Sequence, residues 1–504
     1  MSDPTNLRQL WRQKTLAPLL AGCLLLAAVL LVFSPNYRWD AHKGDSPYGS
    51  DFLQEWTAAS MIGAGHASEL YSPAAFAAWQ HDPQRVGFEW NDDSYYPAVY
   101  PPAYYWLCSP LQWIDYRWAV CLWLGLSMAA LLAAAAVIQR AVRMGNGPET
   151  NFFCSRSRQT LDAKQLATNS SRSRSRQTLD AKQPATNSSR SRSRQTLDAA
   201  WPIQSLATSA TPARDNYPEP PAKPPAITAW FWPAMLLFPP LLLGLTMGQK
   251  GPIWLLLWSV TWLLMRGGRP LVAGLAFGLL SIKPTLFFLL PLVMLRHGQW
   301  RFVAGASLSW AALWGAAASV LPSNVWTDFL AVARSAGDYH QHAGYQLTWS
   351  SNLQSLVAGL PQWVPGWISA LLWMIPAGYV LWRIAAQSQF RLQNSRDLCQ
   401  VLLATCLLSP HLYAYDLVVL LLPICGMWHT HRREAVVILA GLWLGMLASQ
   451  PCLSTIGLPL MPVVLLTQFY WLSTVRPGQS SVRKGVSGRP APSYILQTGL
   501  SAQA

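Results

Sequence analysis

Charged residues are scarce in this chain. They make up 12% of its 504 residues, whereas an ordinary soluble protein carries about 25%. A water-facing surface for a chain of this length needs more Lys, Arg, Asp and Glu, so a set of soluble domains is excluded. Hydrophobic residues make up 52%, which excludes disorder over most of the chain. The composition therefore predicts a polytopic helical membrane protein.

Familiar nucleotide- and metal-binding patterns are also missing. The sequence has no GxxxxGK[ST] loop, no HExxH and no carboxylate cluster suited to Mg²⁺. Its eight Cys show no CxxC or Cys/His ligand spacing, and most lie inside apolar runs. We therefore expect no disulfide framework, no metal site and no cofactor. ATP and sugar nucleotides are not expected as direct substrates.

Long apolar runs dominate what is present. A helix needs about 20 apolar residues to cross a bilayer, and the runs approaching that length are 16–33, 98–114, 116–138, 227–247, 252–266, 270–295, 302–321, 363–384, 398–428, 435–449 and 460–475. Lys283-Pro284 interrupts one run and Ser409 to Asp416 interrupts another. Proline breaks helical hydrogen bonding, so each of these two runs is predicted to form two helices. The expected fold is an all-α polytopic bundle of roughly 11–13 helices, some short, broken or re-entrant.

The connections between the runs alternate in basic content. The connections rich in Lys and Arg are 139–226, 266–269, 296–301, 383–396, 429–433 and the tail from 476. Those poor in Lys and Arg are 34–97, 248–251, 322–362 and 450–459. The positive-inside rule then predicts that the first set is cytosolic and the second is outside, and it accounts for the net charge of +15 without nucleic acid. If 98–114 crosses the membrane fully, the alternation fails and the basic connection 139–226 lies outside. If this run is instead a re-entrant segment that opens at Tyr100-Pro101-Pro102, the connection 139–226 stays in the cytosol.

These observations predict an organisation in six parts. They are a cytosolic end with an uncleaved first span (1–34), an outer loop with amphipathic helices and a short apolar segment (35–115), a span (116–143), an insertion (144–226), a transmembrane bundle with outer loop 322–362 (227–475), and a disordered cytosolic tail (476–504). The insertion repeats the Ser157–Ala163 text at Ser175 and Ser193. It is predicted to be disordered, either as a duplicated flexible segment or as an Arg/Ser-rich tether for nucleic acid or anionic lipid.

Ionisable residues near membrane depth mark the candidate site, because each costs about 2.5–3.5 kcal/mol to insert. Asp51 and Glu55 lie four residues apart shortly after the first run and would share a helix face, unless both are solvated loop residues. Lys250 lies in a tight turn and Lys283 inside an apolar run. A phosphate partner would keep either lysine charged; Lys250 could instead be a snorkelling interfacial residue.

A second polar group follows Ser409-Pro410. His411 is able to donate to a phosphate or to move a proton near neutral pH, although a hydrogen-bonded structural histidine is the commoner case. Asp416 either orients His411 or caps the next helix, and Tyr415 lies beside it.

Seven short stretches, in order, resemble glycosyltransferase family 87, the polyprenol-phosphate-mannose-dependent mannosyltransferases with a GT-C fold. They are Asp51-Phe52; Gly65-His66 with Tyr71 to Phe76; Tyr100-Pro101-Pro102; Gly248 to Pro252; Ala273-Gly274 to Pro284; Ser351 to Leu356; and Ser409 to Leu412 with Tyr415-Asp416. The resemblance covers nearly the whole chain outside 144–226. The chain departs from the pattern in that insertion and in Lys250, where a neutral residue is expected.

The resemblance implies transfer of a hexose, with mannose expected, from a polyprenyl-phosphate donor to an acceptor hydroxyl on the outer face, with inversion. Asp51 would be the base. The residues assigned to the donor phosphate are His411, Lys283, Lys250 and Gln249, with Glu55, Tyr415 and Asp416 in support. The expected partners are that lipid donor, a glycolipid or glycan acceptor and the bilayer of the cell (inner) membrane, without nucleic acid. Two alternatives of other classes stay open, a lipid or small-molecule transporter or flippase and a non-catalytic membrane scaffold.

Overall fold

The computed structural model describes residues 37–38, 46–47, 49–89, 95–145, 235–334, 350–358, 360, 363–388 and 390–475. The predicted first span at 16–33, the repeats of the insertion and the tail at 476–504 lie outside these residues. Contacts divide the chain into two units, 1–139 with 232–504 and 140–231. The description below concerns the first unit and the last residues, 140–145, of the helix that begins at Tyr116.

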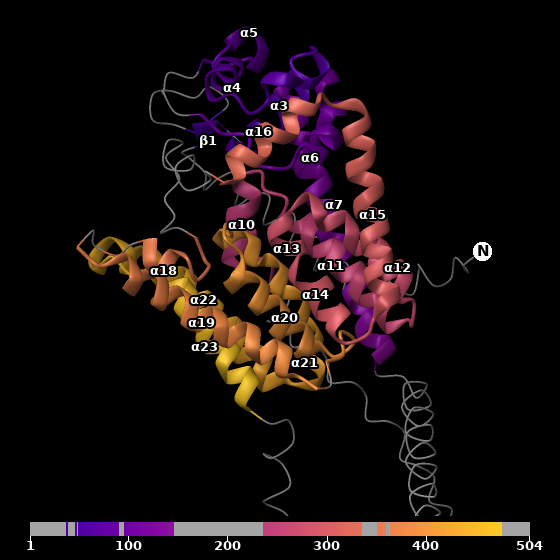
Figure 1. Ribbon diagram of the computed structural model, residues 1–504, viewed down its shortest axis with the longest axis vertical. Coiled ribbons are helices and arrows are strands. Elements are labelled where there is room, and N and C mark those ends of the chain that lie inside the picture. The colour runs from indigo at the N-terminus through magenta and orange to yellow at the C-terminus, as the bar shows by residue number, and fades with distance from the viewer. Residues whose placement is uncertain are drawn as a thin grey trace, which may run out of the picture. The chain divides into compact units, whose positions relative to one another are not determined.

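The described part of the chain is almost wholly helical (Figure 1). Its strands are a short parallel pair, β1 (Tyr37–Arg38) and β2 (Ser46–Pro47). The prediction of an all-α polytopic membrane protein is confirmed.

Helices long and apolar enough to cross a membrane are found in four places in the described residues. They are α7 (Tyr116–Gly145), α15 (Trp300–Val320), α19 (Gly366–Ala386) and α22 (Arg432–Ile456). Each coincides with a predicted apolar run, and each exposes large side chains such as Leu126, Trp310 and Leu444. Exposed apolar side chains on a long helix are expected where lipid replaces water as the neighbour.

Shorter helices fill the rest of the bundle. They are α10 (Pro239–Thr246), α11 (Gly251–Arg266), α12 (Pro270–Gly278), η4 (Leu279–Ile282), α13 (Pro284–Phe287), α14 (Leu289–Arg296), α16 (Ser323–Arg334), α18 (Ser355–Ala358), α20 (Ser395–Leu408), η6 (Ala414–Leu420), α21 (Leu421–Thr430) and α23 (Leu460–Thr474). Helix α20 lies in the core, because all its residues from Leu398 to Leu407 are buried.

Both predicted breaks are present. Lys283 lies between η4 and α13, and the segment from Ser409 to Tyr413 separates α20 from η6. In each case a proline follows the end of a helix, where it cannot supply the next backbone donor. The breaks leave the polar residues of the sequence motifs at helix ends, and not on lipid-facing helix surfaces.

The run 98–114 does not form a membrane-crossing helix. It divides into α6 (Pro102–Cys108) and η3 (Ser109–Trp113). Seven α-helical residues rise only about 10 Å, against a hydrocarbon core of about 30 Å. The helix length therefore favours the alternative in which this run enters without crossing.

The segment after Gly49 is a series of short helices. They are η1 (Ser50–Phe52), α3 (Leu53–Gly63), η2 (Ala67–Glu69), α4 (Pro73–Gln80) and α5 (Pro83–Val86). The first part of α3, from Leu53 to Ala59, is buried, whereas in α4 the apolar Phe76 is buried and Pro73 and Ala74 are exposed. Helix α3 packs on α6 and η3, and the Trp56 indole donates to the carbonyl of Ile114 at 2.8 Å. This packing buries the start of α3.

Helices α12 and α15 pack backbone to backbone. A Cβ added to Gly274 would lie 2.0 Å from the carbonyl oxygen of Phe302, and one added to Gly305 would lie 2.1 Å from that of Leu271. Small residues at such a crossing are typical of membrane helices, whose association depends on close packing. This contact fixes α12, and with it the break that carries Lys283.

Candidate active site

The turn between α10 and α11 docks onto the segment that carries Asp51. The Asp51 amide donates to the carbonyl of Met247 at 3.1 Å, and the Trp123 indole donates to that of Gly248 at 2.8 Å. Gly248 has φ of 70°, and a Cβ there would lie 3.0 Å from Phe52 Cβ. Only glycine tolerates both the conformation and the approach. Two segments about 200 residues apart are thereby held in register.

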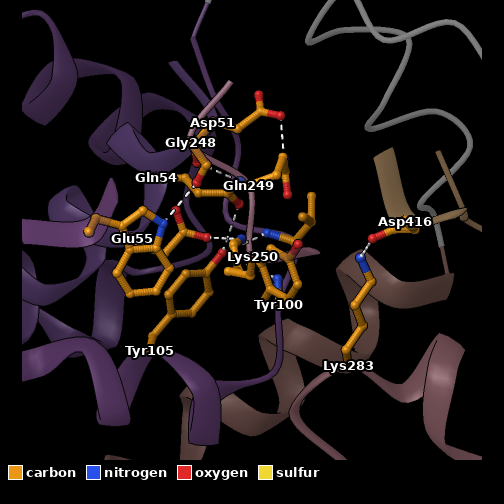
Figure 2. A network of polar contacts seen from close by, with 12 residues as sticks. Asp51, Gln54, Glu55, Tyr100, Tyr105, Gly248, Gln249, Lys250, Lys283 and Asp416 are labelled. Atoms are coloured by element: carbon orange, nitrogen blue, oxygen red, sulfur yellow. Dashed lines mark hydrogen bonds and ion pairs between the residues drawn. The ribbon is translucent and has the colours of Figure 1, made fainter. Parts of the chain in front are cut away.

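That register pairs two adjacent side chains with two carboxylates (Figure 2). The Gln249 amide donates to Asp51 Oδ2, and the Lys250 ammonium forms an ion pair with Glu55 Oε1. All four residues are buried. Because Asp51 and Glu55 are one helical turn apart, they meet two consecutive residues of the turn. The alternatives of solvated acids and of a snorkelling Lys250 are both wrong.

Tyr100 covers the Lys250 ammonium. Its ring centroid lies 3.9 Å from Lys250 Nζ. Two tyrosines fix the segment that carries Tyr100. The Tyr105 hydroxyl accepts from the amides of Val99 and Tyr100 at 2.9 and 3.2 Å. The Tyr71 hydroxyl donates to the Tyr100 carbonyl at 2.6 Å. Lys250 therefore has a carboxylate on one side and an aromatic face on another.

A second buried ion pair lies beyond Tyr100 (Figure 2). Lys283, at the break before α13, pairs with Asp416 of η6. Lys283 Nζ also lies 6.0 Å from the Tyr100 centroid and 5.8 Å from that of Tyr415. Asp416 was predicted to orient His411 or to cap a helix. The contact the structure gives it is with Lys283, because both breaks in the apolar runs meet here.

The segment before η6 is held by Ser351 and Asn352. The amide of Ser351 donates to the Leu412 carbonyl at 2.7 Å, and the Asn352 side chain donates to the Pro410 carbonyl at 2.7 Å. His411 lies between these two anchored residues. Burial lowers the pKa of the His411 imidazole below its ordinary value. It is therefore a neutral hydrogen-bonding group at neutral pH.

Tyr413 is influenced by the charges of both Asp51 and Asp416. The pKa of its hydroxyl is raised above the ordinary value by burial first, and then by the charges of Asp51 and Asp416. Its ring stacks on Tyr415 with centroids 5.7 Å apart. Tyr100 and Tyr413 were not predicted as site residues. Their signal in the sequence is weak, because tyrosines are common at membrane interfaces.

Carboxylates outnumber cations in this cluster, which we call the acidic cluster: Asp51, Glu55, Gln249, Lys250, Lys283 and Asp416. Three carboxylates face two ammonium groups. Burial raises the pKa of the Glu55 carboxyl, and the Lys250 ammonium opposes that rise. Glu55 Oε2 and Gln249 Oε1 are buried and have no hydrogen-bond partner among the described residues. Such oxygens can accept from hydroxyl groups.

Metal binding has no evident support in the described part of the chain. No three His, Cys, Asp or Glu residues gather there to hold an ion. The carboxylates of the acidic cluster contact cationic or amide groups of the chain itself. The cluster therefore offers a carboxylate that accepts from a neutral amide, beside two buried ion pairs.

Comparison with known proteins gives one result. A family model described as glycosyltransferase family 87 matches residues 98–167 and 196–410, which is more than half of the chain. The matched region contains Tyr100, Gln249, Lys250 and Lys283, while Asp51, Glu55, His411 and Asp416 lie outside it. No curated protein and no solved structure matches the chain.

Proposed function

The chain belongs to glycosyltransferase family 87 and is a membrane glycosyltransferase, and we propose that it transfers mannose from a polyprenyl-phosphate donor to an acceptor hydroxyl. Transfer takes place on the outer face of the cell membrane with inversion, and Asp51 is the base. Family membership favours this activity over the transporter and scaffold alternatives. The observation that carries the proposal is the buried contact between Asp51 and the neutral amide of Gln249.

A general base must be oriented and still able to accept a proton. An amide donor orients the Asp51 carboxylate without supplying a positive charge that would weaken it as a base. In the proposed step the acceptor oxygen attacks the anomeric carbon while its proton passes to Asp51. The bond from the anomeric carbon to the phosphate oxygen breaks, and its electron pair leaves with polyprenyl phosphate. A single displacement of this kind inverts the anomeric centre.

Lys283 and His411 are the proposed contacts of the donor phosphate. The leaving phosphate gains negative charge, and donors already aimed at it lower the barrier. Lys283 pairs with Asp416, and a phosphate oxygen would take the place of that carboxylate. His411, a neutral imidazole, donates an N–H. Tyr415 supports Lys283 through its ring.

The direction of the helices supports the proposed outer location. Helix α11 begins after Lys250 and ends at Arg266, and α14 follows the Lys283 break and ends at Arg296. Helix α20 begins beside Arg396 and ends before Ser409. Each helix thus joins a basic loop to the acidic cluster. The positive-inside rule assigns the basic loops to the cytosol, which leaves the cluster on the opposite side.

Replacement of Asp51 by Asn tests the proposal. Membranes containing the Asp51→Asn protein would be given a short-chain polyprenyl-phosphate mannose with a labelled sugar, and label in membrane glycans would be counted. We expect transfer to fall by about 10³-fold, as for loss of a general base. The control is Asp328→Asn on α16, outside the cluster. Full transfer by Asp51→Asn would exclude the base, and a retained anomeric configuration in the product would exclude inversion.

A further inference from the structure

The contact between Glu55 and Lys250 has no part in the chemistry above. Both side chains are fully buried, and Lys250 Nζ faces Glu55 Oε1 and the Tyr100 ring. An ammonium group enclosed in this way has no open side for a donor phosphate. Lys250 is nevertheless the residue next to Gln249, whose amide donates to Asp51. The pair therefore needs an explanation of its own.

Charge placement supplies one. Asp51 and Glu55 are one helical turn apart and interact electrostatically, and their partners Gln249 and Lys250 are consecutive residues. The ammonium that pairs with Glu55 is therefore carried by the residue next to the one that contacts Asp51, and without Glu55 it would lose the carboxylate that holds it in this position. A lysine bound to Asp51 would displace the Gln249 amide and would favour the ionised carboxylate, which then accepts a proton less readily.

We propose that Glu55 is a positioning residue that acts through Lys250: it holds the ammonium away from Asp51, so that Asp51 keeps its contact with Gln249 and its strength as a base. The inference rests on the proposed role of Asp51. It explains why one acid of the pair has a neutral partner and the other a cationic one.

Other groups also act on Asp51 and must be held constant in a test. Among the described residues, the titratable groups with an electrostatic effect that involves Asp51 include Glu55, Tyr100, Tyr116 and Tyr413, with Lys250 beside Glu55. Burial raises the pKa values of Tyr100 and Tyr413, which therefore stay neutral near pH 7. Between about pH 5 and pH 8 they do not change charge.

The test compares Glu55→Gln, Lys250→Met and the double variant. Transfer from the labelled polyprenyl-phosphate mannose would be measured against pH in purified full-length protein, as kcat and KM. In Glu55→Gln the unopposed ammonium favours ionised Asp51, so the acidic limb of kcat should move to lower pH and kcat should fall about tenfold with little change in KM. In Lys250→Met the unopposed Glu55 carboxylate should move that limb to higher pH.

The double variant lacks both charges, so its acidic limb should return to the wild-type position and its kcat should exceed that of Glu55→Gln. Glu434→Gln, which removes a carboxylate from a largely buried ion pair elsewhere, is the matched control and should leave the limb in place. The inference would be overturned if the acidic limb of kcat moved in the same direction in both single variants. It would also be overturned if the fall in kcat of the double variant equalled the product of the falls in the two single variants.

Folding is followed by gel filtration in detergent. If the single variants do not accumulate as folded protein, the double variant decides: we expect it to fold and to retain transfer within about tenfold of wild type, and a folded double variant without transfer contradicts the inference. Asp51→Asn is measured in parallel. Full transfer by Asp51→Asn refutes the role of Asp51 as the base. If Asp51→Asn loses transfer but the acidic limbs of kcat in Glu55→Gln and Lys250→Met do not move, only the role of Glu55 is refuted.

Discussion

Two polar clusters, one buried and one partly buried, lie at the two ends of α20, and their charges are satisfied by different partners. At its C-terminal end lies the acidic cluster, in which Lys250 and Lys283 pair with carboxylates. At its start lies a second cluster, here called the arginine cluster: Arg383, Arg396, Gln400 and Glu434. Arg396 donates to the carbonyls of Leu472, at 2.7 Å, and Val475. Gln400 donates to Leu472 at 3.0 Å, and Arg383 to Ser473.

The arginine cluster is accounted for by the fold itself. The last carbonyls of a helix have no partner within it, and α23 ends at Thr474. Cations near a helix C-terminus also interact favourably with its dipole. The contacts of the acidic cluster are instead between side chains of distant segments, although both clusters leave some buried polar atoms without a partner in the described structure. Burial of charge alone therefore does not mark a functional site, because the capping of α23 accounts for the buried charge of the arginine cluster.

The largest difference between the two clusters is expected when a whole ion pair of the acidic cluster is neutralised, because transfer should fall much more than stability. In Lys283→Met with Asp416→Asn, both charges disappear, which often leaves folding intact. We expect transfer to fall by about 10²–10³-fold because a phosphate contact is lost, while the unfolding temperature changes by only about 2–4 °C. The measurement is kcat with the mannosyl donor beside thermal unfolding. Wild-type kcat in this variant would assign Lys283 to the fold only.

The opposite outcome is expected in the arginine cluster. Arg396→Met leaves the carbonyls of Leu472 and Val475 without their donor, and we expect the free energy of unfolding to fall by about 3 kcal/mol. Transfer per folded molecule should stay at the wild-type level. Denaturant unfolding and kcat would be compared with Arg433→Met, an exposed arginine on α22. Loss of kcat in folded Arg396→Met would break the distinction between the clusters.

Two glycines with the same backbone conformation sharpen the comparison further. Gly248 and Gly298 have φ of 70° and 68°, but only Gly248 has atoms within 4 Å of an added Cβ. Alanine should cost about 1–2 kcal/mol of stability at either position through its conformation. At Gly248 it should also move the turn that carries Gln249 and lower kcat about tenfold. Equal kcat values for the two alanine variants would mean that the turn does not position Asp51.

The smallest effect concerns His411 and pH. Because burial lowers its pKa, the folded protein binds the proton less readily than the unfolded chain does. The contribution of His411 is therefore fully present above about pH 6.5 and is lost as the pH falls through that value towards the lower folded pKa. His411→Gln should reduce the acid-induced fall in unfolding temperature by about 2 °C. His66→Gln, at a half-exposed side chain, is the control, and an equal change there would assign the effect to surface charge.

Much of the architecture could be predicted from local sequence. The apolar runs at 116–138, 302–321, 363–384 and 435–449 correspond to α7, α15, α19 and α22. The breaks at Lys283-Pro284 and Ser409-Pro410 are where proline requires them. The resemblance to glycosyltransferase family 87 is confirmed. These features depend on a few neighbouring residues, so a single sequence is enough to find them.

The partners within the site were less predictable. Lys250 was expected at a donor phosphate, and the structure pairs it with Glu55, 195 residues away. The contacts of Tyr100 with both lysines and the capping by Arg396 were missed as well. Each depends on which helix ends meet, and spacing along the chain does not specify that.

By itself, the sequence determined that the chain resides in a membrane, where its helices break and which family it joins, because hydrophobicity and proline act over one or two helical turns. Tertiary structure decided that Asp51 contacts Gln249 and that Glu55 pairs with Lys250. That choice follows from the docking of a glycine turn onto a distant helix, since charges find partners only when the packing of the intervening helices brings them into contact.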